Sequence, residues 1–193
     1  MAVPHGTSVR IPELWGHNAV AEFNLIAKLK HKFSTVAIDS EFPGSFRFDS
    51  LCSEEHSEEE STYRALKANV DMMKLIQVGI TLIDNRGQLP MIDGAYCIWQ
   101  FNLRNLDLRT DRYIKSSIEL LRNSGIDFEQ NRRDGLASRT LGSLLRKHGL
   151  VFNPRIRYVC YQGDYCWSHV SPAPHYSWRV PTHMPPVHKD TPL

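Results

Sequence analysis

An apolar run that ends in two carboxylates constrains the fold of this chain more than any other feature. Residues 33–44 read Phe-Ser-Thr-Val-Ala-Ile-Asp-Ser-Glu-Phe-Pro-Gly, and the apolar part has the length of a buried strand. In a strand the side chains at i and i+2 leave the same face, so Asp39 and Glu41 are expected to point together. The Phe-Pro-Gly that follows is typical of a turn or loop. The run therefore predicts a strand with two acids at its carboxyl end.

Two acids on one face of a strand can bind a cation. At a strand rise of about 3.3 Å per residue the Cα atoms of Asp39 and Glu41 would lie roughly 6.6 Å apart, and both side chains can reach one oxygen-preferring ion. A two-metal phosphodiester site, whose ions lie about 3.5 to 4 Å apart, needs further carboxylates from elsewhere in the chain. The alternative is that the two acids simply end a strand where it reaches solvent.

Composition indicates an ordinary globular domain. A chain of 193 residues, with 41% hydrophobic and 23% charged residues, is predicted to form one domain with a substantial core. No stretch approaches the ~18 consecutive apolar residues that span a bilayer, and the first residues lack the pattern of a signal peptide, so we expect an intracellular protein with no membrane partner. The four cysteines, Cys52, Cys97, Cys160 and Cys166, show no CxxC spacing and are predicted to be free thiols.

Hydrophobic spacing predicts the elements around the acid strand. A helix is expected to begin at Asn18 as its N-cap, and a second should follow the Ser- and Glu-rich stretch 50–61. The apolar residues expected on their inner faces are Val20, Phe23 and Ala27 in the first helix and Tyr63, Leu66, Val70 and Met73 in the second. Residues 75–83 and 96–101 read as strands, and a turn is expected at 84–87. With the acid strand they predict an antiparallel meander.

The second half of the chain reads as helices followed by a strand. One helix is expected to start at Asp111 with Thr110 as its cap, and another to run to His148 with Gly149 as its C-terminal stop. The residues expected to face inward are Ile114, Ile118 and Leu121 in the first and Leu141, Leu144 and Leu145 in the second. Residues 156–161 read as a further strand. This order of elements predicts an α/β sheet with helices packed on it.

Several blocks, in order along the chain, resemble one known family. The phrase at 36–44 resembles the first motif of the Caf1/Pop2 poly(A) deadenylases, which are 3′ to 5′ exoribonucleases of the DEDD class. The other matching blocks are Ile11-Pro12-Glu13-Leu14-Trp15 with Asn18 and Glu22-Phe23, Asn69-Val70-Asp71, residues 75–81, Trp99-Gln100-Phe101-Asn102, residues 117–121 and Ser124-Gly125-Ile126. The resemblance implies a ribonuclease H-like exonuclease fold, a mixed sheet flanked by helices, incomplete at the C-terminus.

The resemblance also implies a chemistry. In the family two divalent ions, Mg²⁺ or Mn²⁺, bind four acidic side chains, and a histidine assists as general base while adenosines are removed one at a time from the 3′ end of an mRNA tail. Asp39 and Glu41 match the first two of these acids. Phe42, beside them, could stack on an RNA base or could equally be a buried core aromatic.

The third acid of the family has no direct match. In the family the strand that corresponds to residues 158–161 leads into a Tyr-Asp-Phe-Gly-Tyr-type motif, whose Asp is a metal ligand. Aligned without gaps on Tyr165, this chain has Cys166 in that place, and a soft thiolate suits Mg²⁺ poorly. Asp164 could substitute only after a shift of backbone register, and such sites tolerate displacements of only about 0.5 Å. We therefore expect severely reduced or absent catalysis, with weak binding of a single metal ion.

The two ends of the chain are expected to differ from the domain between them. Residues 1–10 are predicted to be a flexible arm, and residues 11–170 to be the partial deadenylase-like domain. Residues 171–193 contain six prolines and no helical or strand periodicity, which predicts a disordered tail. The three histidines of this tail, His175, His183 and His188, fit no ligand spacing and are interpreted as bystanders.

Positive charge gathers in one segment although the net charge is only +2. Residues 122–157 contain eight basic residues and three acids, whereas five glutamates lie between residues 54 and 60. Because phosphate contacts supply much of the affinity for RNA, the basic segment is a candidate RNA-contacting surface. The alternative is a solvated helix face with ordinary lysines and arginines.

The resemblance implies partners, and it leaves other functions open. Family members act on poly(A) RNA in the nucleus and cytoplasm, within the CCR4-NOT complex, where they contact a NOT scaffold subunit and a second deadenylase. A chain that keeps this surface without the chemistry would be a non-catalytic interaction module, and a truncated product that folds poorly is a third possibility. A proofreading-type DEDD exonuclease would also use the two acids, but the Trp-Gln-Phe-Asn block at 99–102 is not expected in it.

Overall fold

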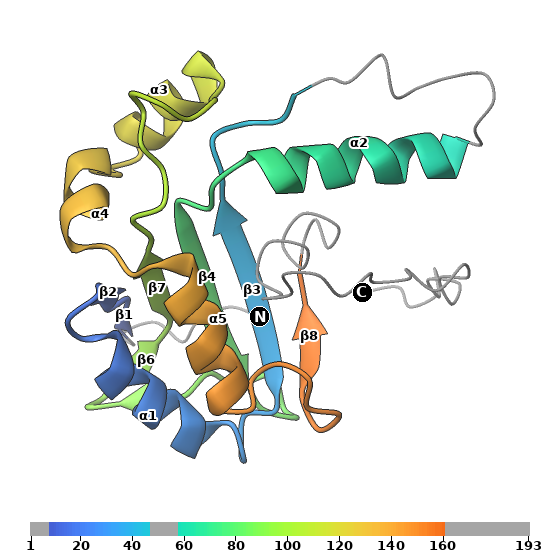
Figure 1. Ribbon diagram of the computed structural model, residues 1–193. Helices are drawn as coiled ribbons and strands as arrows, with labels where there is room; N and C mark the ends of the chain where they lie inside the picture. The colour runs from blue at the N-terminus through green and yellow to red at the C-terminus, as the bar shows by residue number, and fades with distance from the viewer. Residues whose placement is uncertain (1–7, 47–57, 161–193) are drawn as a thin grey trace.

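The computed structural model describes residues 8–46 and 58–160, which form a mixed sheet flanked by helices (Figure 1). The helices are α1 (Ala19–Leu29), α2 (Glu58–Met72), α3 (Lys115–Asn123), α4 (Phe128–Asp134) and α5 (Ser138–Lys147). The strands are β1 (Val9–Arg10), β2 (Glu13–Leu14), β3 (Thr35–Glu41), β4 (Gln77–Ile83), β5 (Met91–Ile92), β6 (Ala95–Cys97), β7 (Trp99–Asn102) and β8 (Arg157–Val159). The predicted α/β class is confirmed.

The strands form two sheets. The larger has the order β2-β7-β4-β3-β8, and the smaller the order β1-β6-β5. β3 pairs with β4, and β4 with β7, in antiparallel fashion, which confirms the predicted meander. β8 joins the other edge of β3 in parallel, so that the acid strand lies inside the sheet.

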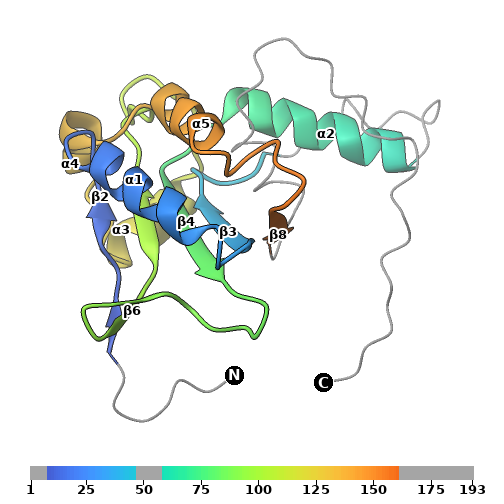
Figure 2. The same cartoon turned by 90° about the horizontal axis from the view of Figure 1, so that it is seen from below.

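Alternate residues of β3, β4 and β7 point to opposite faces of the larger sheet. The helix face consists of Val36, Ile38, Val78, Ile80, Leu82, Trp99 and Phe101, all of them buried. The acid face consists of Asp39, Glu41, Gln77, Gly79, Gln100 and Asn102. Figure 2 shows α1 and α5 together on one side of the sheet. Phe23 of α1 contacts Phe101 with ring centroids 5.0 Å apart, so these helices cover the helix face.

Most of the expected core positions are confirmed. Phe23, Ile118, Leu121 and the three leucines of α5 are buried. α5 ends at His148 as its C-cap, and Gly149 follows with φ +61°, a left-handed conformation that glycine adopts without strain. A second apolar cluster joins α3 and α4 to the loop before β4 through Ile76, Leu106, Ile118, Leu121 and Phe128.

The start of α1 differs from the expectation in its contacts. Asn18 is the N-cap by position, but its side chain makes no cap bond with α1. Its Oδ1 instead accepts a hydrogen bond from Trp15 N at 2.7 Å, which closes the turn that precedes the helix. Val20 was expected to face inward but is 51% exposed, and Ile26 occupies the core in its place. In α2, Val70 is half-buried, and the buried Met73 follows the last residue of the helix.

The predicted strand at 96–101 is in fact two strands in different sheets. β6 pairs with β1 and β7 with β2, because residues 9–14 run parallel to this segment along its length. Ile98, between the two strands, donates its N–H to Arg10 O at 3.1 Å. Val9 and Arg10, assigned by sequence to a flexible arm, therefore form β1.

The helix predicted to start at Asp111 begins four residues later, at Lys115. Residues 107–111 form a turn of their own, because Asp111 donates its N–H to Asp107 O at 2.8 Å and accepts Asp107 N at 2.8 Å on its carboxylate. Thr110 belongs to that turn, and the N-cap of α3 is Ile114. α4 was not predicted, although Asp127 is a strong N-cap whose side chain accepts from Glu129 N and Gln130 N.

Some expectations fall outside the described part of the chain. These are Asp164, Tyr165 and Cys166, the tail at 171–193, and the side chains of Tyr63 and Leu66. Cys97 is a free thiol, as predicted, whereas Cys52 and Cys166 are not described. Among the described helices none has the length and apolar character needed to cross a bilayer.

Candidate metal centre

β3 places the two predicted acids on one face at its carboxyl end. Along the strand Val36, Ile38 and Ser40 are buried, while Asp39 is exposed and Glu41 is half-buried. This alternation confirms the expectation that both carboxylates leave the same face. Ser40 N donates a hydrogen bond to Asp39 Oδ1 at 3.0 Å, and Ile76 N donates to Glu41 O at 2.8 Å. Both acids are thus held by a strand that β4 pairs along its whole length, while β8 pairs with its other edge at residues 35–37.

The environment of Glu41 favours its neutral form. Burial raises the pKa of its carboxyl above the ordinary 4.5, and the negative charge of Asp39 raises the pKa further. Two carboxylates that repel one another, one of them half-buried, gain from a cation between them. The electrostatics therefore suit a positively charged ligand.

Polar side chains from the neighbouring strands continue the acid face. In register, Glu41 lies opposite Gln77, and Gln77 lies opposite Asn102. Gln77 Nε2 donates to Asn102 Oδ1 at 2.7 Å. Asn102 is 2% exposed, and its Nδ2 has no hydrogen-bond partner among the described residues. A row of acid, amide and amide thus crosses three strands.

A glycine lies beside Asp39 in the next row. Gly79 pairs with Asp39 and with Gln100, and a Cβ atom at this position would lie 3.9 Å from Asp39 Cβ. The missing side chain leaves space next to the exposed carboxylate. Sequence reasoning did not select Gly79, Gln77 or Asn102 as site residues, although Gln77, Gly79 and Asn102 lie within the quoted family blocks.

The residues after β3 are fixed by bonds to two helices. Gly44 N donates to Phe42 O at 2.8 Å, and Ile114, the N-cap of α3, donates its N–H to Pro43 O at 2.8 Å. The buried Asn69 of α2 bonds the backbone of Phe46. Phe42 itself is half-buried next to Glu41. Its side chain is therefore in a position from which either role predicted for it, core packing or base stacking, is available.

The described residues supply two carboxylates that suit a metal ion. Carboxylate oxygens are the hard ligands that Mg²⁺ and Mn²⁺ prefer, so Asp39 and Glu41 fit the metal that the resemblance implies. Within residues 8–46 and 58–160, no group of three or more histidine, cysteine, aspartate or glutamate side chains could hold a metal ion. β8 runs parallel to β3, with Val159 paired to Ala37. The chain therefore reaches residue 160 beside the acid strand, and Asp164 follows outside the described part.

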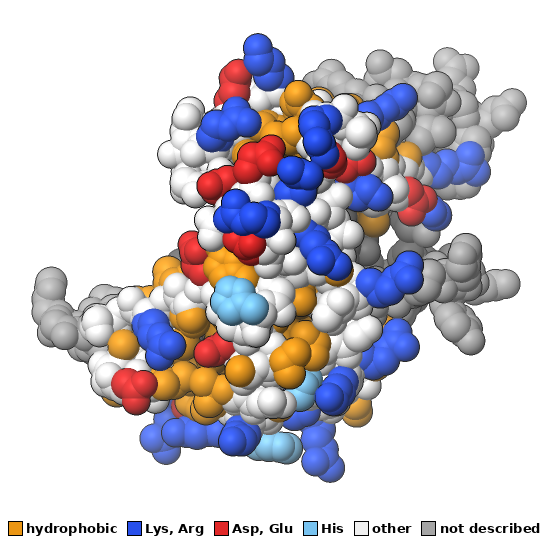
Figure 3. Space-filling view, turned by 60° about the vertical axis from the view of Figure 1, so that its left-hand side comes forward, with side chains coloured by type: hydrophobic (Ala, Val, Ile, Leu, Met, Phe, Trp, Pro, Cys, Tyr) orange, Lys and Arg blue, Asp and Glu red, His pale blue; other side chains and the backbone are white. Residues whose placement is uncertain are grey.

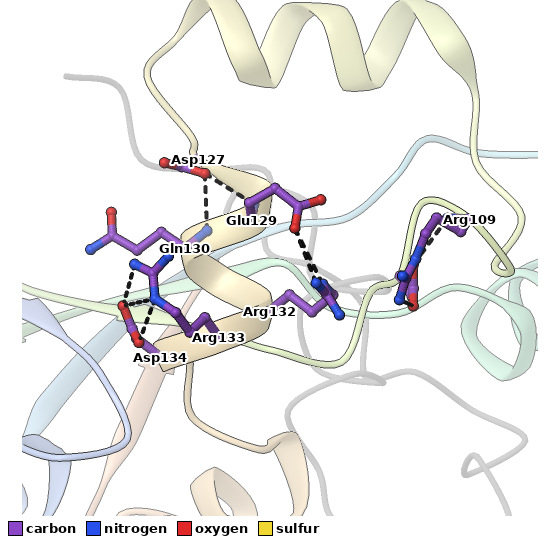
Figure 4. Close-up of polar contacts among 8 residues, drawn as sticks. Arg109, Asp127, Glu129, Gln130, Arg132, Arg133 and Asp134 are labelled. Carbon is purple, nitrogen blue, oxygen red and sulfur yellow. Dashed lines mark hydrogen bonds and ion pairs between the residues drawn. The ribbon is translucent and has the colours of Figure 1, made fainter.

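The basic segment is partly neutralised by its own acids. Figure 4 shows Arg132 directed at Glu129 and Arg133 at Asp134, with nitrogen–oxygen distances of 3.2 and 2.8 Å. In the loop before α3, the side chain of Arg109 bonds Asp107 and holds the pKa of that carboxyl well below its usual range. On the surface in Figure 3 blue and red side chains alternate over this region. Arg132 and Arg133 of α4 thus have acidic neighbours within their own helix, as on an ordinary solvated helix face.

Fold and site together define a class of protein. A mixed α/β domain with paired carboxylates at the end of a central strand is the arrangement of metal-dependent nucleases of the ribonuclease H-like type. The particular family follows from comparison, because a family model described as CAF1 family ribonuclease matches residues 15–140. The chain belongs to the CAF1 ribonuclease family.

Curated relatives agree with this assignment. The chain is 41% identical over 166 residues to "Probable CCR4-associated factor 1 homolog 10" of Arabidopsis thaliana, which covers 82% of the chain and 57% of the relative. It is 34% identical over 160 residues to "Poly(A) ribonuclease pop2" of Schizosaccharomyces pombe, covering 83% of the chain and 46% of that protein. The chain thus spans about half the length of the curated relatives it matches.

Solved structures show the same fold. The Mg²⁺- and Mn²⁺-bound form of S. pombe Pop2p superposes with a TM-score of 0.77 at 33% identity, covering 86% of this chain and 66% of that one. Yeast CAF1 co-crystallised with the NOT1 MIF4G domain gives a TM-score of 0.68 at 26% identity, covering 88% and 60%. The fold class inferred from the resemblance is confirmed.

Proposed function

We propose that this chain is a poly(A)-directed 3′ to 5′ exoribonuclease of mRNA deadenylation, with reduced catalysis of its own. The observation that carries the proposal is the pair Asp39 and Glu41 on the acid face, inside the segment that matches the family model. The Mg²⁺- and Mn²⁺-bound Pop2p neighbour supports a divalent ion as the ligand of these two acids.

The two acids differ in the roles that their surroundings allow. Asp39 is exposed and, with Gly79 beside it, can meet an ion that arrives from solvent. Glu41 is half-buried and its pKa is raised. A cation bound beside it would stabilise the charged carboxylate and so lower this pKa. A bound divalent ion would polarise the scissile phosphodiester and lower the pKa of a bound water. Phe42, next to Glu41, is the side chain we propose for stacking on the RNA base.

The proposal includes reduced catalysis because a cysteine, and not an acid, is present at one expected ligand position. Cys166 stands where the resemblance places the third acid, and a thiolate is a poor ligand for Mg²⁺. Asp164, two residues earlier, is the alternative ligand. Either way the site of this chain is proposed to hold one ion weakly, with Asp39 and Glu41 as its firm ligands.

The proposal is tested with a 5′-labelled RNA that ends in adenosines. The purified chain is incubated with Mg²⁺ and then with Mn²⁺, and compared with the variants Asp39→Ala and Cys166→Asp. We expect slow shortening or none by the natural chain, none by Asp39→Ala, and a gain of activity in Cys166→Asp. A cytidine-ending RNA of equal length is the control for preference.

Two results would contradict the proposal in different ways. Fast shortening by the natural chain that Asp39→Ala abolishes would show that another residue supplies the third ligand, and Asp164→Ala would then identify it. Shortening that persists in Asp39→Ala would remove the acid pair from the mechanism altogether.

A non-catalytic interaction module is the second candidate, favoured by the structural neighbour solved together with the NOT1 MIF4G domain. Under this proposal the chain binds the NOT scaffold and the second deadenylase of the CCR4-NOT complex, in nucleus and cytoplasm, without cutting RNA. Co-purification with the scaffold in the absence of nuclease activity would favour it, and fractionation of cells that express the tagged chain tests the location.

A further inference from the structure

The segment that leaves the acid strand is short and tightly bent. Residues 42–46 turn away from β3 through Gly44, whose φ of +113° is a conformation that other residues adopt only with strain. A Cβ atom at Gly44 would lie 2.5 Å from Ile114 Cγ1, so the segment packs directly against the start of α3. Its course decides where Phe42 lies relative to Glu41.

One buried side chain holds the far end of this segment. Asn69 of α2 is 1% exposed. Its Oδ1 accepts from Phe46 N at 2.7 Å, and its Nδ2 donates to Phe46 O at 3.0 Å and to Ala65 O at 2.9 Å. The amide therefore bonds both backbone groups of Phe46, as a neighbouring strand would, and ties them to a helix 23 residues further along the chain.

Only an amide of this length can make these bonds. Aspartate lacks the donor for Phe46 O, leucine lacks both groups, and serine is too short to bond both backbone groups. A buried carbonyl or N–H left without its partner costs free energy, so the side chain at position 69 is strongly constrained. Neither the apolar core nor the acid pair explains this constraint.

We infer that Asn69 is a positioning residue for the RNA-binding side of the site. By fixing Phe46 it holds the far end of residues 42–46 in place, and so constrains the direction in which the Phe42 side chain leaves the backbone next to Glu41, where a base of the RNA can stack. This inference rests on the proposed function. The acids themselves do not depend on Asn69, because β4 pairs with both of them through Gly79 and Gln77.

The inference separates two measurable properties. Loss of Asn69 should weaken the binding of RNA while leaving the affinity of the acid pair for a divalent ion unchanged. A purely structural role would lower the stability and reduce both affinities together. Asn153 provides a matched control, because its side chain also bonds a loop carbonyl and a loop N–H, Gly149 O at 2.9 Å and Arg155 N at 3.1 Å. In Figure 1 its loop, between α5 and β8, lies at the opposite end of the sheet from the carboxyl end of β3.

The experiment uses the full chain and the variants Asn69→Ala and Asn153→Ala. Dissociation constants are measured for a labelled oligoadenylate by fluorescence anisotropy in Ca²⁺, and for Mn²⁺ by electron paramagnetic resonance. Thermal melting and amide hydrogen exchange of residues 42–46 are recorded in parallel. In Asn69→Ala we expect the dissociation constant for RNA to rise by about tenfold, the order of one lost base–aromatic stack. The Mn²⁺ constant should change by less than about twofold.

A second variant reaches the same segment without touching Asn69. Gly44→Ala adds the Cβ that clashes with Ile114 and strains φ, so it should shift residues 42–46 and weaken RNA binding in the same way, again with Mn²⁺ binding intact. Because it leaves the amide in place, it keeps the inference testable if Asn69→Ala fails to fold. Asn153→Ala should melt earlier than the natural chain but bind the RNA unchanged.

The results decide the inference and the proposed function separately. RNA binding that stays constant in Asn69→Ala and Gly44→Ala overturns the inference. So does RNA binding that weakens equally in Asn153→Ala for the same loss of melting temperature. A natural chain that binds no oligoadenylate overturns the proposed function and the RNA part of the inference. Hydrogen exchange then still tests positioning, because exchange at 42–46 must accelerate in Asn69→Ala and not in Asn153→Ala.

Discussion

The helix face and the acid face of the larger sheet are built from neighbouring residues of the same strands, yet they have opposite surroundings. On the helix face Trp99 and Phe101 are completely buried under α1 and α5. On the acid face Asp39 is exposed, and Gly79 and Gln100 are half-buried. One residue along a strand therefore separates a position that serves stability from one that is available to a ligand.

This separation explains how a stable sheet can carry repelling carboxylates. The free energy of folding comes mainly from apolar burial on the helix face, whereas the acid face contributes little and includes an unfavourable pair. Substitutions on the two faces should therefore differ in kind as well as in size.

The largest difference is expected between two adjacent residues of β7. Phe101→Ala removes a fully buried ring that contacts Phe23, and should lower the free energy of unfolding by about 3 to 5 kcal/mol. Gln100→Ala, on the acid face, should change it by no more than about 0.5 kcal/mol. Urea-induced unfolding of both variants, followed by circular dichroism, measures the contrast. Equal losses in both variants would show that the acid face also contributes to the core.

A smaller loss is expected from a polar contact at the border of the helix face. Trp99 Nε1 donates to Glu22 Oε2 of α1 at 3.0 Å, and Trp99→Phe deletes this bond to a charged acceptor. The expected loss is about 1.5 to 3 kcal/mol, because the carboxylate then lies without its donor. The control is Glu22→Gln, which keeps an acceptor and should lose less. A larger loss in the control would mean that the charge of Glu22 acts elsewhere.

The sequence predicts the two acids of the acid face but not the polar residues that neighbouring strands add to it. The two-residue period of β3 sufficed to place Asp39 and Glu41 together, because alternation is a local property. Gln77 and Asn102 lie beside them only because three strands pair in a particular register. That register cannot be predicted from the sequence of one strand alone. Asn69 is further removed, since its hydrogen bonds join α2 to the segment after β3.

The helices show the same limit. α5 was predicted because its leucines repeat at helical spacing and Gly149 ends it. The start of α3 was placed too early, since Thr110 resembles a cap while a carboxylate turn at 107–111 holds the chain out of the helix. α4 has only two buried residues, Phe128 and Asn131, which give no apolar period, so its single local signal was the cap at Asp127.

Metal addition should affect the acid face alone. If Mn²⁺ binds the folded chain at Asp39 and Glu41, an ion concentration of about ten times the dissociation constant stabilises it by about 1.4 kcal/mol. Thermal melting with and without Mn²⁺ measures this shift, and a chelator should reverse it. Asp39→Asn should lose the shift while Phe101→Ala, where it still folds, should keep it. A shift that survives in Asp39→Asn would place the ion elsewhere.

The pH dependence of stability should carry a contribution from Glu41 that opposes high pH. Its folded pKa is raised above 4.5 by burial and by Asp39, so the folded chain favours the neutral carboxyl. The stability from this group is present below pH 4.5 and is lost as pH rises through the folded pKa. Glu41→Gln should therefore be more stable than the natural chain above that pKa, by a difference that disappears below pH 4.5. Urea unfolding over a pH series measures the difference.

The smallest effect, with the opposite sign, should come from His148, the C-cap of α5, which packs on Phe23 of α1 over the helix face. Its ring stacks on Phe23 with centroids 5.8 Å apart, and burial, followed by the charges of Lys147 and Lys30, lowers its pKa below 6.5. The neutral ring is thus favoured in the fold, so its contribution is present above pH 6.5 and is lost as pH falls through the folded pKa. His148→Phe keeps a ring against Phe23 without a titrating group, and should lose stability less steeply than the natural chain on the acid side of pH 6.5. If the free energy of unfolding falls equally steeply below pH 6.5 in both chains, the lowered pKa of His148 contributes nothing to stability. Glu41 would then be the one residue of this pair whose titration changes the stability.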